Sequence, residues 1–130
     1  MKFMRARSQK EIDDRQDEII TACDTLYSRA GYDGVNFKAI SELTSFSRPT
    51  VYNYFKTKEE ILLALLKREM LRWRGSFLKR VEEADNMTKE QYCACLTDCL
   101  LEHSKMFRLL ALLFSSLENN NRCRNSSVNS

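Results

Sequence analysis

The sequence predicts an all-α protein: a three-helix helix-turn-helix domain followed by a long connecting helix and an incomplete helical bundle. Three glycines and one proline among 130 residues are too few for a turn-rich β fold. Apolar residues recur at spacings of three and four along most of the chain, which is typical of amphipathic helices. Between residues 37 and 58, two short periodic runs flank an interruption at Thr44-Ser45, and this pattern indicates two helices joined by a tight turn.

The bulk composition excludes several classes of protein. A net charge of +3 is mild, so any affinity for nucleic acid must depend on where the charges lie. No apolar run is long enough to span a membrane, and the N-terminus lacks the apolar core of a signal peptide. We therefore expect a cytoplasmic protein whose five cysteines are reduced, with one domain or one domain plus an incomplete second.

Residues 1–8 are basic, and we expect them to form a flexible arm. They include three basic side chains and no acid. Chain termini usually fray, so a solubilising role and a role in reaching phosphates or the minor groove both stay open. A capping box at residues 8–11 then opens the first helix, and Gly31 is the candidate for its C-cap.

The helix-turn-helix domain is expected at residues 9–57. Asn36 can cap its second helix, and the third helix follows Ser47. Between residues 37 and 58, four cations stand against the single acid Glu42, an excess that suits a phosphate backbone. The periodicity places Val51 and Phe55 in the core. The positions of the third helix that do not point inward are Arg48, Thr50, Tyr52 and Asn53.

These stretches carry a resemblance to a known family. ISEL at residues 40–43 and FSRPTVYNYFKTKE at residues 46–59 resemble the DNA-binding signature of the tetracycline-repressor (TetR) family. The resemblance covers roughly residues 15–66 and includes apolar positions of the first helix and Gly31-Tyr32. It implies a regulator that binds double-stranded operator DNA as a homodimer and responds to a small-molecule effector.

The chain departs from the family pattern at two positions that are usually glycine, Ser45 and Pro49. A residue other than glycine at Ser45 costs about 1 kcal/mol if the turn needs a positive φ, or else the turn is built differently. Pro49 suits the first turn of a helix, where its missing N–H would be unpaired anyway. Because proline disfavours helical dihedrals at the residue before it, the cap of the third helix is either Ser47 or Arg48.

The resemblance also implies roles at the DNA. Arg48 and Asn53 are the candidates for base edges, because arginine pairs with guanine and asparagine with adenine. Pro49 is expected to touch a thymine methyl group. Tyr32 is expected in the core beside the third helix. The candidates for phosphate contacts are Tyr52, Tyr54 and Lys58, with Asn36, Lys38, Ser47 and Thr50 as weaker ones.

Residues 58–117 are expected to form a partial C-terminal effector and dimerisation domain. The sequence predicts a long helix from Lys58 to about Ala84, a fifth helix capped near Thr88, and a sixth over roughly residues 105–117. Residues 118–130 are polar and aperiodic, so we expect a disordered tail.

An apolar stripe on these helices is most often core, but in the family resembled it encloses the effector pocket. The candidate pocket residues are Met70, Trp73, Phe77, Tyr92, Leu96 and Phe114.

No catalytic or cofactor site is expected. The chain has one histidine, no glycine-rich phosphate loop and no nucleophile motif, so it should not be an enzyme. Cys95, Cys99 and His103 stand four apart and could ligate a soft metal. The more ordinary interpretation is two small core cysteines and a histidine at the helix end.

The sequence thus predicts a sequence-specific DNA-binding transcriptional regulator, with repression as the expected mode. The alternative is a small helical protein-interaction module whose basic surface is incidental. The residues of the third helix discriminate between them, because an interaction module has no reason to gather cationic and phosphate-reaching side chains on one short helix.

Members of the family continue for several more helices, and the last two pair with a second subunit. Here the apolar periodicity ends at Leu117, and the composition changes abruptly from Asn119 onward. A natural truncation, a frameshifted reading and an unusually short regulator are all open; we favour the first two. We predict that the 130-residue chain forms no tight dimer through the family's usual surface and binds its operator weakly, because little apolar surface remains to bury the roughly 800 Å² per partner of a stable interface. Sedimentation velocity at low micromolar concentration tests this, and a stable dimer with strong cooperative operator binding would contradict it.

Overall fold

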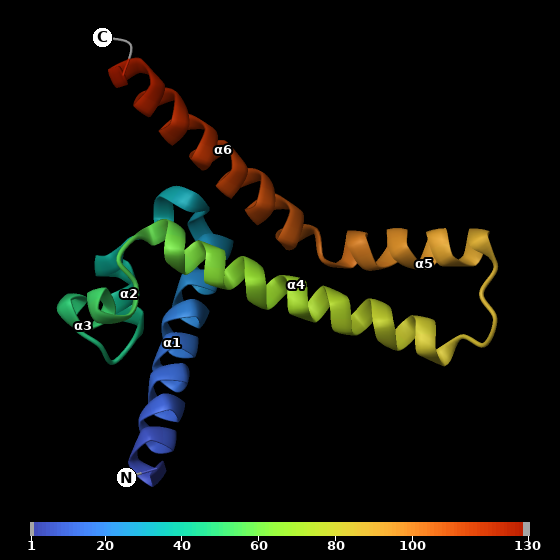
Figure 1. Cartoon of the computed structure of the whole chain (residues 1–130), viewed down its shortest axis with the longest axis horizontal. Helices are drawn as coiled ribbons and strands as arrows, with labels where there is room; N and C mark the ends of the chain where they lie inside the picture. Colours follow the sequence, from blue (N-terminus) through green and yellow to red (C-terminus); the bar gives the residue numbers. More distant parts are fainter. Residues whose placement is uncertain (1, 129–130) are drawn as a thin grey trace. The chain divides into compact units, whose positions relative to one another are not determined.

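The computed structural model describes residues 2–128, with side chains placed for residues 8–122. Over this range the all-α prediction is confirmed (Figure 1). The elements in order are α1 (Lys2–Ala30), the 3-10 helix η1 (Tyr32–Gly34), α2 (Phe37–Leu43), α3 (Arg48–Tyr54), α4 (Lys58–Glu83), α5 (Lys89–Glu102) and α6 (Ser104–Val128).

The chain divides into two compact units, residues 1–65 and 66–130. The division falls inside α4, between Leu65 and Leu66, whereas the sequence predicted it at the start of that helix. The difference has a physical reason: Ile61, Leu62 and Leu65 are fully buried and belong to the first unit by their contacts. The first two turns of α4 therefore complete the helix-turn-helix domain.

The first unit is built around α1. This helix packs against η1 and α2, and α2 packs against α3. Apolar side chains at helical spacing form the core, and burying each large one contributes about 1.5–3 kcal/mol. The fully buried ones are Ile19, Cys23, Val35, Ile40, Val51, Ile61, Leu62 and Leu65.

The connection from α1 to α2 is fixed by two glycines. Gly31 has a φ of +70° and donates its N–H to the Tyr27 carbonyl at 2.9 Å, so the predicted C-cap is confirmed. Gly34 is required by space, because a Cβ there would lie 2.4 Å from the Cβ of Ala30. Asn36 then caps α2 by accepting a 2.8 Å hydrogen bond from the Ala39 N–H, as the sequence predicted.

The turn between α2 and α3 is built without a positive φ. Among the described residues, Asn86 is the only one other than glycine with a positive φ, so Ser45 carries no such strain. Instead, the Ser45 N–H donates to Glu18 Oε1 at 3.3 Å, and Thr44 Oγ1 accepts from the Phe46 N–H at 3.3 Å. A carboxylate on α1 thus stabilises the turn at the position where the family usually has glycine.

In the second unit, α5 returns alongside the C-terminal half of α4 (Figure 1). Thr88 and Gln91 form a reciprocal capping box that starts α5, as predicted. Arg80 of α4 donates two hydrogen bonds, at 2.7 and 2.6 Å, to the carboxylate of Glu102, and this bond holds the pKa of that carboxyl below its ordinary value. Phe77 meets Tyr92 edge to face at 5.5 Å.

The structure differs from the sequence-based expectation at both ends. α1 begins at Lys2 rather than at the predicted cap Ser8, so residues 2–8 are helical where an arm was expected. α6 continues to Val128, where residues from 118 onward were expected to be disordered. Neither segment contains proline or glycine, so nothing interrupts propagation of a helix that is already nucleated. Residues 1, 129 and 130 of the predicted arm and tail lie outside the described residues.

Several large apolar side chains of the second unit are exposed. Leu101 is 71% exposed, Phe114 66% and Leu117 62%, while Met106, Leu109 and Leu113 on the same helix as Phe114 are buried. Apolar surface of this kind marks an interaction site or an aggregation liability.

The construction of the turn can be tested at Ser45. Because Ser45 has no positive φ, Ser45→Gly should destabilise the protein by about 0.4–1 kcal/mol through the added entropy of the unfolded chain. Urea unfolding measures this change. Gly31→Ala is the matched comparison, since its cost of about 1–3 kcal/mol comes from the backbone conformation alone (φ +70°, ψ −160°), with no atom within 4 Å of the added Cβ. A stabilising effect of Ser45→Gly would contradict the geometry.

Candidate nucleic-acid interface

The start of α3 is set by Ser47. Its side chain accepts a 3.4 Å hydrogen bond from the Thr50 N–H, and its backbone is extended at φ −76° and ψ 163°, so Ser47 is the cap and the alternative at Arg48 is wrong. Arg48 is already helical although proline follows it. Pro49 sits in the first turn, where the helix has no use for its N–H.

The two sides of α3 differ in character. Val51 is fully buried and Phe55, the residue that caps the helix, is 8% exposed, as the sequence predicted. Pro49 and Asn53 on the other side are exposed, and Arg48 is exposed at the first position of the helix, three residues before Val51. A seven-residue helix thus presents an apolar ring and an amide to solvent on one side and a cation at its start.

Tyr52 is held by its ring. It stacks flat on Phe37 of α2, with ring centroids 4.1 Å apart and an interplanar angle of 8°. Stacking of this kind restricts the rotamers of Tyr52 while 41% of the residue stays exposed. Lys56 donates from Nζ to the Tyr52 carbonyl at 3.1 Å, which brings a further cation to the end of α3.

Tyr54 forms a hydrogen bond with a residue of α1. Its hydroxyl accepts a 3.1 Å hydrogen bond from Nη1 of Arg15, thirty-nine residues earlier in the chain. This bond raises the pKa of Arg15. Periodicity and motif spacing gave no indication of Arg15, because the pairing depends on how α1 packs beside α3.

Lys58 lies at the first position of α4 with its ammonium 3.6 Å from the centroid of the Tyr32 ring, a cation–π contact. The Tyr32 hydroxyl donates a 2.6 Å hydrogen bond to Glu59 Oε1, which raises the pKa of Tyr32. The expectation that Tyr32 is simply core is therefore wrong. It is half-buried, and it uses both its ring and its hydroxyl to hold the start of α4.

The weaker candidates for phosphate contacts lie at the N-termini of α2 and α3. Asn36 and Lys38 are exposed at the N-terminus of α2, and the hydroxyls of Ser47 and Thr50 are 2.9 Å apart at the N-terminus of α3. Both helix N-termini therefore carry polar side chains, and such ends favour anions. The assignment of DNA contacts to individual residues stays a prediction.

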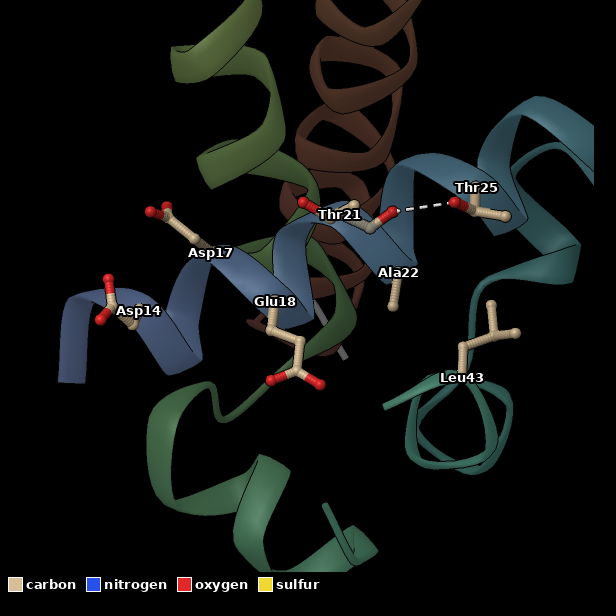
Figure 2. A pocket seen from close by; sticks show the side chains of 7 residues that line it. All are labelled: Asp14, Asp17, Glu18, Thr21, Ala22, Thr25 and Leu43. Carbon is tan, nitrogen blue, oxygen red and sulfur yellow. Dashed lines mark hydrogen bonds between the residues drawn. The ribbon is translucent and has the colours of Figure 1, made fainter. Parts of the chain in front are cut away.

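An acidic groove lies on α1, within the first unit (Figure 2). It has a volume of about 380 Å³. Its lining residues are Asp14, Asp17, Glu18, Thr21, Ala22, Thr25 and Leu43. Carboxylates gathered in this way repel anionic groups such as phosphates.

Half of the six effector-pocket candidates form one aromatic group. Trp73 and Phe77 stack with centroids 5.9 Å apart, and Phe77 meets Tyr92. The indole Nε1 of Trp73 is buried without a hydrogen-bond partner. Met70 is 48% exposed and Phe114 66%, while Leu96 is half-buried, so the pocket stays a prediction.

The geometry gives the metal candidate no support, because among the described side chains no three histidine, cysteine or acidic residues lie where they could hold a metal ion. His103 ends α5 with φ −113° and ψ 40°, so it leaves the helix face that Cys95 and Cys99 share. Partial burial raises the pKa of the Cys95 thiol, which disfavours the thiolate that a metal requires. None of the described helices is long and apolar enough to cross a membrane.

Comparison with known proteins identifies the first unit. Residues 19–65 match the family model described as bacterial regulatory proteins, tetR family. The fatty acid metabolism regulator protein of Bacillus subtilis (strain 168) is 32% identical over 96 residues, which are 72% of this chain and 44% of that protein. The HTH-type transcriptional repressor KstR of Rhodococcus jostii (strain RHA1) is 33% identical over 69 residues, or 53% of this chain and 31% of that protein. This chain thus matches less than half the length of either relative. No solved structure matches it significantly.

Proposed function

We propose that the chain is a transcriptional regulator that binds operator DNA, on the premise that residues 19–65 match the tetR family of bacterial regulatory proteins. Repression is the proposed mode, since one relative carries the name of a repressor. Binding to bacterial DNA would place the protein in the cytoplasm. Regulation through DNA binding requires no catalysis.

One observation carries this proposal. α3 exposes Pro49 and Asn53 opposite its buried side, Arg48 is exposed at its start, and the exposed cations Lys38 and Lys56 flank it. A helix anchored in the core on one side, with exposed cations at its start and on both flanks, suits insertion into the major groove of B-DNA. The alternative, a protein-interaction module, would favour an apolar exposed side on α3.

The side chains support a division of roles. Tyr52, Tyr54 and Lys58 are each held by an aromatic or hydrogen-bonded partner, which suits groups that position the helix on phosphates. Arg48 and Asn53 are exposed at positions from which a guanidinium and an amide could reach base edges.

We further propose that a small-molecule effector controls the binding of DNA. The aromatic group of Trp73, Phe77 and Tyr92 offers an apolar surface, and the unpartnered Nε1 of Trp73 offers one hydrogen-bond donor. An apolar molecule that carries a hydrogen-bond acceptor would pack on this surface and accept the hydrogen bond from Nε1 of Trp73. Because Trp73 is the only tryptophan, its fluorescence reports directly on such binding.

A homodimer would complete the function. One recognition helix covers one half-site, and two half-sites about 34–36 Å apart need two copies of the domain. The direct test of the whole proposal is a gel shift with the DNA upstream of the protein's own coding region. Retardation of this fragment but not of a matched unrelated fragment supports it; equal behaviour of the two fragments contradicts specific binding.

Substitutions of Arg48 and of Lys58 should change DNA binding in different ways. Arg48→Ala should relax the base preference at one position of each half-site, at a cost of about 1–3 kcal/mol for the preferred sequence. Lys58→Ala should weaken binding to all sequences alike and lower the salt slope, because phosphate contacts carry no sequence information. Fluorescence anisotropy with a panel of half-site variants measures both. A uniform loss of affinity in both variants would show that this division of roles is wrong.

Pro49 should touch a thymine methyl group. Its ring is exposed at the start of α3, and it has no N–H with which to bond a base. Replacing the contacted thymine by uracil removes only that methyl and should weaken binding measurably. The control is the Pro49→Gly variant, which should not respond to the same replacement. Unchanged affinity of the unaltered chain at every thymine of the half-site would refute the contact.

A further inference from the structure

We propose that Arg15 of α1 and Tyr54 of α3 bind one phosphate of the DNA backbone together. The inference rests on the proposed function, and it adds a residue outside the helix-turn-helix motif. It also extends the DNA-binding surface to α1, although most of that helix near Arg15 is acidic.

The geometry of the hydrogen bond determines what Tyr54 can still do. Nη1 of Arg15 donates to the Tyr54 hydroxyl at 3.1 Å, so the phenolic oxygen acts as acceptor in this bond. A phenol has a single hydrogen to donate, and that hydrogen is left for another acceptor. A phosphate oxygen is such an acceptor, and Tyr54 lies in the last turn of α3.

Arg15 brings the charge that a phosphate needs. The residue is exposed, and one of its five N–H donors is used in the bond to Tyr54. The remaining donors form a fixed planar fork that suits phosphate oxygens. The bond to the neutral phenol forms although the Glu11 carboxylate lies one turn away on the same helix.

The acids of α1 confine this contact to one place. Arg15 is the only basic residue between Glu11 and Glu18, and Asp14 and Asp17 line the acidic groove. Phosphates near that groove would be repelled, so a DNA strand that passes residues 11–18 of α1 is favoured only at Arg15. Attraction at one residue and repulsion beside it would fix the position of the strand.

A phosphate contact can be tested without knowing the operator. The probe is a fluorescein-labelled DNA duplex of arbitrary sequence, about three helical turns long, titrated at several salt concentrations. The variants are Arg15→Gln, Tyr54→Phe and the double variant. Arg29→Gln is the matched control, because Arg29 is another exposed arginine in the last turn of α1. Circular dichroism checks that each variant keeps its helical content.

We expect Arg15→Gln to weaken binding about three- to tenfold and to lower the slope of log affinity against log salt by about 0.9, the value for one phosphate contact. Tyr54→Phe should also weaken binding. The double variant should lose little more than the stronger single variant, because both groups serve one phosphate. Arg29→Gln should leave the slope unchanged.

Four outcomes would overturn the inference. The first is binding by Arg15→Gln equal to that of the unaltered chain. The second is a loss of affinity in Arg29→Gln as large as in Arg15→Gln, which would reduce the effect to overall charge. Full additivity of Arg15→Gln and Tyr54→Phe would indicate separate contacts. In these three cases the proposed function stands, because the unaltered chain binds DNA. Absence of any DNA binding by the unaltered chain would overturn both this inference and the proposed function.

Discussion

A seven-residue helix does not persist by itself in water, and the arrangement of the first unit follows from that constraint on α3. The helix is stabilised from several directions. Val51 anchors it in the core, Ser47 caps its start, Phe37 stacks on Tyr52, and Arg15 bonds to Tyr54. Each contact comes from a different part of the chain. The exposed residues of α3 are therefore not needed to stabilise the helix, because its buried side and the contacts at its ends supply the stability.

Charge is segregated rather than balanced. The overall excess of three positive charges says little, since residues 11–24 of α1 carry six acids and one base while residues 37–58 carry four cations and one acid. Glu18 uses its charge twice: it accepts from the Ser45 N–H in the helix-turn-helix turn, and it lines the acidic groove. The acid that supports the turn thus also contributes to the groove on α1 whose negative charge would repel phosphates.

Local signals in the sequence predicted most of the helices. Capping residues such as Asn36 and Thr88 act within four residues of their partners, so their roles can be deduced from spacing alone. The pairings of Arg15 with Tyr54 and of Glu18 with Ser45 could not be deduced, because they join residues thirty-nine and twenty-seven positions apart. The chain ends were mispredicted for a different reason: polar composition was taken for disorder, although neither segment contains a residue that breaks a helix.

The close approach at Gly34 has a consequence for how this domain can vary. A single added methyl group would collide with Ala30 and push η1 away from α1. Asn36 follows two residues later and fixes the start of α2, so the displacement would pass to both helices of the motif. Gly75, by contrast, has open space around it and an ordinary φ. A substitution would thus be tolerated at Gly75 and selected against at Gly34, where the missing side chain keeps the two helices of the motif in register.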